Sequence, residues 1–210
     1  WPNKKGMSVV LDLGANIECS DKNLIDFTIM GSSLYKSLFP DETPKAALLN
    51  IGSEELKGNE VIKSTYQKLN QIKNEDFEFN GFIEGNHLMD GDVNVIVADG
   101  FTGNVALKTA EGTARLVSTY VRQALTASPL SKMGALLAGP GLKDLRKKMN
   151  PSSVNGGVLL GLNGVVVKSH GGADADGYAT AIRLAANLAH SNYMQEVATG
   201  LVRVSKQGIG

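Results

Sequence analysis

Short runs of apolar residues alternate along this chain with segments whose apolar residues recur at helical spacing, and this alternation constrains the fold most strongly. The run at residues 93–98 is apolar almost throughout, as expected for a strand buried on both faces. Strands that alternate with helices predict an α/β fold whose mainly parallel sheet is covered by helices on both faces. The predicted strands span Ser8 to Leu13, Ala46 to Ile51, Phe77 to Glu84 (a short or edge strand) and Val93 to Ala98.

The predicted helices follow these strands. The first is expected to begin near Ser20 or Asp21, either of which is suited to cap it, and the second follows the loop of residues 52–58. The third is expected to open at Asn104, and the last runs from about residue 174 to past residue 190. Before the last helix, strands at 158–162 and 165–168 are predicted to pair around a tight Asn163-Gly164 turn. The third helix carries an apolar face formed by Val117, Tyr120, Val121, Ala124 and Leu125.

Residues 130–150 are predicted to form a protruding hairpin of two short helices, because Pro129 interrupts the helical pattern. Five basic residues against Asp144 alone give this segment a net charge of +4. An exposed apolar tip beside basic residues suits an interfacial membrane contact or an acidic protein partner. Alternatively, the apolar residues pack on the body of the protein or on a second subunit. The candidate contact residues are Met133, Leu136, Leu137, Lys143, Arg146 and Lys147.

Composition excludes several classes of protein. The 21 basic residues balance 21 acidic ones, so the chain lacks the excess positive charge that attracts nucleic acid. A single cysteine, Cys19, excludes an internal disulfide, and the three scattered histidines give no metal-site spacing. No apolar window approaches a membrane span, and the first residues do not resemble a signal segment. Without an internal repeat or a low-complexity linker, residues 1–210 are expected to form one catalytic-type domain.

Three loops at the predicted carboxyl ends of strands combine glycine with asparagine: residues 14–16, 50–59 and 99–104. Ligands of parallel sheets bind beyond these strand ends. Glycine lets backbone N–H groups approach an anion and a helix N-terminus adds partial positive charge, which suits a phosphate or a developing oxyanion. The local alternative is that glycine permits the turns and asparagine caps the following helix. The candidate binding residues here are Asn16, Asn50, Gly52, Gly58, Gly100 and Gly103.

Two further side chains are candidates. Lys57 is the only cation in the three loops and lies just before a helix start, where the helix dipole disfavours a positive charge. It either holds an anionic substrate or is solvated, or it pairs with Glu54 or Glu55. His170 ends a strand in another glycine-containing loop, where a structural role is the alternative to binding. The chain lacks the dinucleotide fingerprint, the nucleotide P-loop and the GxSxG nucleophile elbow.

Five segments together resemble the bacterial phosphate acyltransferases of phospholipid synthesis. They are LDLGAN (11–16), LLNIGSEELKGNE (48–60), FNGFIEG (79–85), ADGFTGNVALKTAEGTA (98–114) and GGVLLGLNGVVVKSHGGAD (156–174). Members of that family are longer, and this chain resembles only their later portion. The resemblance implies a three-layer α/β/α fold similar to isopropylmalate dehydrogenases and phosphotransacetylases, a homodimer, and a cytoplasmic protein that associates peripherally with the membrane.

The resemblance also implies a reaction: transfer of a fatty acyl group from acyl carrier protein to inorganic phosphate, without a cofactor or a metal. The proposed catalytic lysine and asparagine of the family fall on Lys57 and Asn104. Lys57 is then expected to hold phosphate, and Asn104 to stabilise the oxyanion. Two rivals remain: a phosphotransacetylase acting on short acyl-CoA, and an inactive fragment that binds a membrane or a partner.

Overall fold

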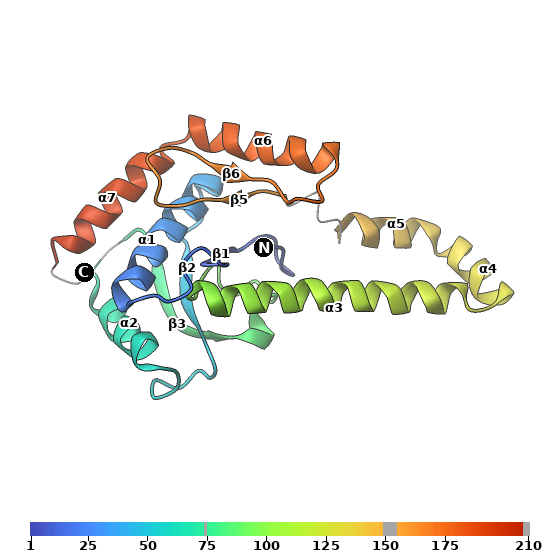
Figure 1. Cartoon of the computed structure of the whole chain (residues 1–210), viewed down its shortest axis with the longest axis horizontal. Coiled ribbons are helices and arrows are strands. Elements are labelled where there is room, and N and C mark those ends of the chain that lie inside the picture. Colours follow the sequence, from blue (N-terminus) through green and yellow to red (C-terminus); the bar gives the residue numbers. More distant parts are fainter. Residues whose placement is uncertain (74, 149–154, 208–210) are drawn as a thin grey trace.

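The computed structural model describes residues 1–73, 75–148 and 155–207; of residues 144–148 it describes the backbone alone. Its central sheet has four strands in the order β1-β4-β2-β3, and all neighbouring pairs are parallel (Figure 1). The predicted parallel sheet is therefore confirmed, although its first and fourth strands are shorter than expected. The strands are β1 (Val9–Leu11), β2 (Lys45–Asn50), β3 (Glu78–Glu84) and β4 (Val95–Val97).

Helices α1 (Asp21–Leu38) and α2 (Glu60–Gln71) follow β1 and β2, as the sequence predicts. Ser20 caps α1 in a capping box with Asn23, and Asn59 caps α2 by accepting a hydrogen bond from the Ile62 N–H group. Gly31 lets α1 approach the sheet closely, because a Cβ there would lie 2.8 Å from Val95 Cγ1. Tight packing of this kind fixes α1 on one face of the sheet.

The two faces of the sheet bury different residues of the same strands, which gives the three-layer α/β/α arrangement. On β2, Ala46 and Leu48 join the larger core with α1, α2 and the C-terminal helix. The alternate residues Ala47 and Leu49 face a smaller core that includes Ala106 of the long third helix. This alternation is the period of two that side chains follow along a strand. The three-layer prediction is therefore confirmed.

Helix α3 (Gly100–Thr126) extends well beyond the sheet, and α4 (Pro129–Leu137) and α5 (Gly139–Lys148) turn back from its far end (Figure 1). These two short helices occupy residues 129–137 and 139–148. The prediction that α3 opens at Asn104 is wrong. The helix begins four residues earlier, because the Asp99 carboxylate caps it by accepting a 2.7 Å hydrogen bond from the Thr102 N–H group.

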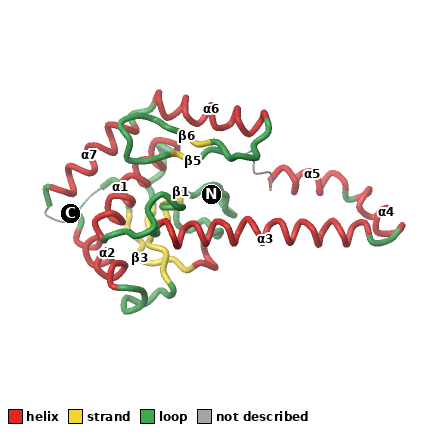
Figure 2. Tube along the Cα trace, viewed as in Figure 1, coloured by secondary structure: helices red, strands yellow, loops and turns green. Residues whose placement is uncertain are grey.

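The C-terminal part differs most from the prediction. Strands β5 (Gly157–Val158) and β6 (Val167–Lys168) pair over only two residues each, so residues 159–166 form a wide loop instead of a tight turn. Helix α6 (Ala175–His190) stops at Ser191, whose N–H and Oγ–H groups both donate to the Leu188 carbonyl. A separate helix α7 (Tyr193–Ser205) follows and packs on α1 (Figure 2). Gly200 allows the close approach, since a Cβ there would lie 2.7 Å from Ile29.

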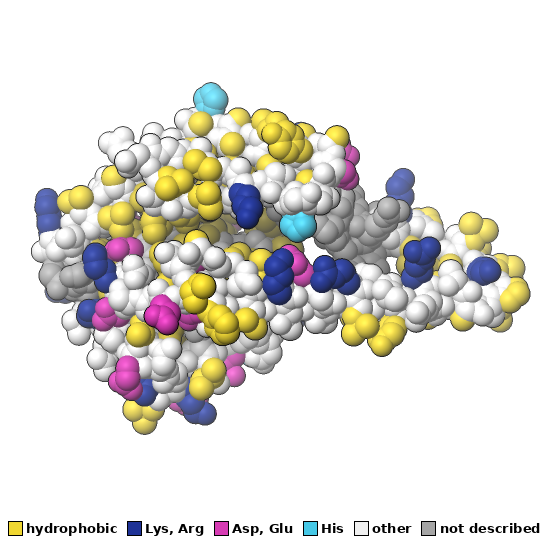
Figure 3. Space-filling model, in the orientation of Figure 1, with side chains coloured by type: hydrophobic (Ala, Val, Ile, Leu, Met, Phe, Trp, Pro, Cys, Tyr) yellow, Lys and Arg dark blue, Asp and Glu magenta, His cyan; other side chains and the backbone are white. Residues whose placement is uncertain are grey.

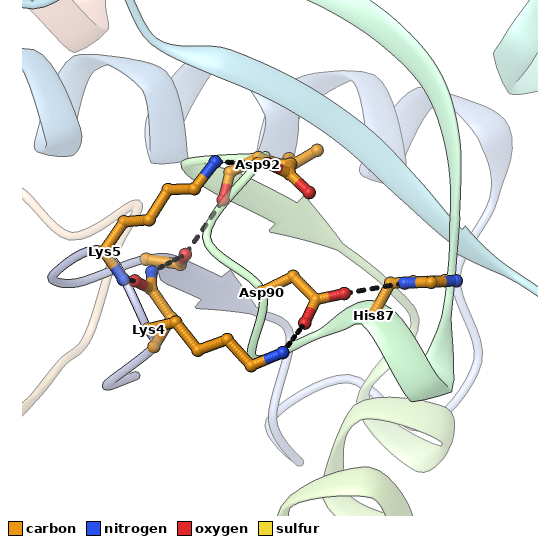
Figure 4. Close-up of polar contacts among 8 residues, drawn as sticks. Lys4, Lys5, His87, Asp90 and Asp92 are labelled. Carbon is orange, nitrogen blue, oxygen red and sulfur yellow. Dashed lines mark hydrogen bonds and ion pairs between the residues drawn. The ribbon is translucent and has the colours of Figure 1, made fainter.

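Ion pairs attach the first residues of the chain to the segment between β3 and β4 (Figure 4). Lys4 Nζ lies 2.6 Å from Asp90, Lys5 pairs with Asp92, and His87 Nδ1 lies 2.7 Å from the second carboxylate oxygen of Asp90. Hydrogen bonds from Lys4 and then His87 lower the pKa of Asp90. Because these pairs are exposed to solvent, they contribute little to stability.

Acid should weaken the junction between α1 and α2. Lys68 Nζ lies 2.9 Å from Asp21, and Ser64 Oγ donates a 2.5 Å hydrogen bond to it; these two contacts lower the pKa of Asp21 to about 2. A carboxyl group with a lowered pKa stabilises the fold above its ordinary pKa and loses that effect as the pH falls. In urea titrations, the stability advantage of wild type over Asp21→Asn should be constant above about pH 4 and shrink towards pH 2. An advantage that does not change with pH would contradict this assignment.

Among the helices of the described residues, none combines the length and the hydropathy that a transmembrane segment requires.

Candidate active site

The candidate site lies at the carboxyl edge of the sheet. Strands β1, β4 and β2 are neighbours and run in parallel, so the loops after them meet at the same edge. These segments, residues 12–17, 99–104 and 51–58, correspond to the three loops that the sequence singles out at residues 14–16, 99–104 and 50–59. Ligands of parallel sheets bind at this edge.

Asp12 organises the loop after β1. Its Oδ1 accepts hydrogen bonds of 2.8 and 2.9 Å from the N–H groups of Gly14 and Ala15, and its Oδ2 accepts 2.7 and 2.8 Å bonds from the backbone and side-chain amides of Asn16. Burial opposes ionisation of this carboxyl group, but the bonds from Ala15, Asn16 and Gly14 outweigh it, so the pKa of Asp12 is lowered. The loop is therefore wrapped around a buried carboxylate.

Replacement of Asp12 by asparagine should loosen this loop. The new amide can still accept from Gly14 and Ala15, but its NH₂ group would face the two Asn16 donors and leave them without an acceptor. Loss of these bonds should lower the free energy of unfolding by about 2 kcal/mol, measured by urea denaturation at neutral pH. Asp99→Asn is the matched control, because asparagine caps helices as well as aspartate does and should change stability little. Equal effects of the two variants would contradict the role of Asp12.

The start of α3 packs against this loop through two glycines. The Gly100 N–H group donates to the Asn16 carbonyl at 2.8 Å, and a Cβ on Gly100 would lie 2.5 Å from that oxygen. A Cβ on Gly103 would overlap the carbonyl oxygen of Asp12, and the Gly103 N–H group donates to the Asp99 carbonyl. Both glycines are buried and both N–H groups are engaged within the protein. In this structure they permit close packing, and their role as phosphate ligands stays a prediction.

Asn104 joins the helix to the same loop. It is the fifth residue of α3, where its side chain donates a 2.9 Å hydrogen bond from Nδ2 to the carbonyl of Leu13. Gly14 makes room for it, because a Cβ there would lie 2.9 Å from that Nδ2 atom. An amide NH₂ carries two hydrogens, so one donor is left for another acceptor. Asn104 is thus held at the edge of the sheet by a bond to the loop after β1, and neither Asn16 nor Asn104 caps a helix.

Asn50 shapes the loop that carries Lys57. The buried Asn50 side chain donates 3.1 Å hydrogen bonds from Nδ2 to the carbonyl groups of Gly52 and Lys57, which joins the two ends of the loop. Gly58 has a φ angle of +95°, and a Cβ there would lie 2.5 Å from Asn50 Oδ1, so this position requires glycine. Both Asn50 hydrogens are used, which makes it a positioning residue for the loop in this structure.

Lys57 is exposed above this loop. Its aliphatic stem runs close to Gly52, where a Cβ would lie 3.1 Å from Lys57 Cγ. In the described stretch of residues 1–73, Lys57 forms no ion pair with Glu54 or Glu55, which excludes that alternative for this structure. Glu55 instead accepts a 2.9 Å hydrogen bond from the Tyr66 hydroxyl group. The loop therefore presents a lysine side chain whose charge is available to an anion.

His170 belongs to a different part of the fold. It follows β6, where its N–H group donates to Asn155 Oδ1 at 2.9 Å and its Nδ1 accepts from the Gly172 N–H group at 3.1 Å. Among the described residues, no hydrogen bond connects His170 with the three loops. The structure does not bring this candidate to Lys57 or Asn104 through any contact, so its role stays a separate prediction.

The hairpin candidates are exposed where the structure describes them. Met133, Leu136 and Leu137 are 59%, 80% and 81% exposed, which excludes packing on the body of this chain. Hydrophobic side chains are visible at the far end of the hairpin in Figure 3. Lys143 is also exposed, whereas the side chains of Arg146 and Lys147 lie outside the described residues. Within the part of the chain that the structure describes, no three His, Cys, Asp or Glu residues are grouped as metal ligands.

The chain matches the sequence model of a known protein family. The family model described as "Fatty acid synthesis protein" matches residues 1–196. The chain belongs to this family. This match and the relatives below confirm the resemblance that the five sequence segments indicate.

Curated relatives of this fatty acid synthesis family carry the name phosphate acyltransferase. The chain is similar to the protein of Pelagibacter ubique, with 58% identity over 197 residues that cover 94% of this chain and 59% of the relative. It is 51% identical to the Maricaulis maris protein over 96% of this chain and 57% of the relative. The Caulobacter vibrioides protein is 49% identical over 98% of this chain and 57% of the relative. The chain therefore spans less than three fifths of the length of these relatives.

Proposed function

We propose that this chain is part of a phosphate acyltransferase, which transfers a fatty acyl group from acyl carrier protein to inorganic phosphate. The observation that carries the proposal is the position of Lys57, whose loop is held at the carboxyl edge of the sheet by Asn50. The same edge carries Asn104 and the N-terminus of α3. The names of the relatives and of the family support phosphate and acyl chemistry.

The reaction needs no covalent enzyme intermediate. A phosphate oxygen attacks the carbonyl carbon of the thioester, and the carbonyl oxygen becomes an oxyanion. Collapse of this tetrahedral intermediate breaks the C–S bond and gives acyl phosphate. The thiolate of the carrier protein leaves and takes up the proton that the hydrogen phosphate brought. Every atom and charge is thus supplied by the two substrates.

Two side chains at this edge of the sheet stabilise the negative charge of the phosphate and of the developing oxyanion. Lys57 binds the phosphate as a point charge and offsets the repulsion between the dianion and the developing oxyanion. The remaining N–H donor of Asn104 stabilises the oxyanion, a contribution that typically lowers a barrier by about 3 to 4 kcal/mol. Asn50 and Asp12 act as positioning residues, because they hold the Lys57 loop and the loop to which Asn104 is bound.

The exposed surfaces favour particular partners. Lys132 and Lys143 are exposed on the hairpin beside the apolar residues Met133, Leu136 and Leu137. Basic and apolar side chains together suit a peripheral contact with the inner face of the membrane, and the basic ones suit an acidic carrier protein. The exposed apolar face of α3, at Val117, Tyr120 and Val121, suits a second copy of the chain. We therefore propose a homodimer of one-domain chains that works in the cytoplasm next to the membrane.

Turnover assays separate this function from its rivals. The purified chain is incubated with long-chain acyl carrier protein or with acetyl-CoA, with and without phosphate, and the released thiol is measured. The proposal predicts phosphate-dependent thiol release from the acyl carrier protein. A preference for acetyl-CoA would support a short-chain phosphotransacetylase. Absence of turnover at every phosphate concentration, together with co-sedimentation with lipid vesicles, would support a membrane-binding fragment.

A further inference from the structure

Large apolar side chains border the polar residues of the candidate site. Ile17 follows Asn16, Leu56 precedes Lys57, and Val105 follows Asn104 in the sequence. These three are 68%, 87% and 51% exposed, and Phe101, one helical turn before Val105, is 64% exposed. Figure 3 shows hydrophobic side chains gathered over the first turns of α3. The polar edge of the sheet thus has an apolar border.

Two of these side chains share a helix face, and a third belongs to the loop that packs on the start of that helix. Phe101 and Val105 are four residues apart on α3, so they lie on the same face of the helix. The hydrogen bond from the Gly100 N–H group to the Asn16 carbonyl places Ile17 next to the start of that helix. Leu56 lies across the edge in the loop after β2, which neighbours β4 in the sheet. The apolar border therefore has contributions from the loops after β1 and β2 and from the first turns of α3.

The exposure of these side chains does not come from loosely attached loops. Asp12 holds the loop of Ile17 through four hydrogen bonds, and Asn50 joins the ends of the loop of Leu56. Isolated exposed apolar residues are common, but a contiguous apolar surface marks a place where another apolar group binds. Small-molecule sites characteristically combine such a surface with a few polar groups that fix the orientation of the ligand.

We propose that Ile17, Phe101 and Val105, with Leu56 opposite, bind the acyl chain of the thioester and set the preference for long chains. This inference rests on the proposed function and adds the acyl subsite to it. With the phosphate on Lys57 and the thioester carbonyl near Asn104, the first carbons of the acyl chain lie against the residues next to these two. A long chain covers far more of the apolar border than an acetyl group, which has a single methyl group beyond the carbonyl.

The test compares Phe101→Ser with Val202→Ser, a control that removes a similarly exposed side chain (54%) from α7, away from the three loops. For each protein, kcat/KM is measured with palmitoyl carrier protein and with acetyl-CoA, and the affinity for a fluorescent long-chain fatty acid is measured separately. We expect Phe101→Ser to lower kcat/KM for the palmitoyl donor roughly tenfold, to weaken fatty acid binding, and to leave the acetyl rate unchanged. Val202→Ser should change none of the three.

The outcomes distinguish the inference from the function on which it rests. An equal loss on both donors, or no loss on either, while wild type is active, would overturn the acyl subsite and leave the proposed function intact. If wild type turns over neither donor, the proposed function fails. The fatty acid affinity then decides, because unchanged binding by Phe101→Ser overturns the subsite as well. A changed oligomeric state on sedimentation, with the donor ratio unchanged, would assign this surface to a second copy and also overturn the proposal.

Discussion

Replacement of Lys57 by methionine is expected to lower the rate of phosphate-dependent acyl transfer by roughly 100-fold or more. Methionine keeps an unbranched apolar stem over Gly52 and is shorter than lysine by one atom, so the change removes little besides the charged end. Without that charge, the phosphate dianion and the developing oxyanion repel each other with no cation between them. The loss should appear in both the KM for phosphate and kcat, measured by thiol release at varied phosphate concentration.

Lys206→Met is the matched control for this prediction. Lys206 is an exposed lysine that follows α7, outside the three loops, and its removal changes the net charge by the same amount. The control should retain the wild-type rate and the wild-type KM for phosphate. Comparable losses in the two variants would mean that overall charge, and not a phosphate site at Lys57, governs the reaction.

Gly103→Ala should be the most destabilising small substitution in the candidate site. The added methyl group would overlap the Asp12 carbonyl oxygen, which belongs to backbone and cannot rotate away. Either α3 or the loop after β1 must move, and this disturbs the bond between Asn104 and Leu13. We expect a loss of about 3 kcal/mol in the free energy of unfolding, measured by urea denaturation, and a parallel loss of turnover.

Gly112→Ala tests the same exchange on the same helix. A Cβ on Gly112 would meet nothing within 4 Å, so alanine should stabilise α3 by up to about 1 kcal/mol through its higher helix propensity. Opposite signs for the two variants would establish that close packing at Gly103 is responsible. A Gly103→Ala protein as stable as wild type would show that the loop after β1 can move away at little cost.

The sequence predicted the sheet well because strands buried on both faces leave a strong pattern. The apolar run around Val95 identified β4, and the candidate cap Ser20 identified the start of α1. The start of α3 was placed too late because Asn104 resembles a cap, whereas the Asp99 carboxylate performs that role. Helix α7 was missed because the sequence shows no obvious break in its helical pattern near Ser191. In the structure, Ser191 ends α6 by bonding to the Leu188 carbonyl.

The sequence predicted the loops of the candidate site but not the hydrogen bonds and close packing that connect them. Which strands are neighbours decides which loops meet, and that order is a property of the tertiary structure. From the sequence, Gly100 and Gly103 are expected to expose backbone N–H groups to an anion. In the structure, the loop after β1 occupies the space where their side chains would lie. Asp12 was missed as the organiser of that loop. An aspartate just after a buried strand and before a glycine is the available signal, because such side chains bond to backbone amides a few residues on.

Inorganic phosphate should bind at the carboxyl edge of the sheet, beside Lys57. Titration of the isotope-labelled chain with inorganic phosphate, followed through the backbone amide NMR signals, tests it directly and does not depend on turnover. We expect saturable shifts concentrated in residues 12–17, 51–58 and 99–104, which weaken strongly in Lys57→Met. Shifts confined to other elements, or unchanged phosphate affinity in Lys57→Met, would contradict it.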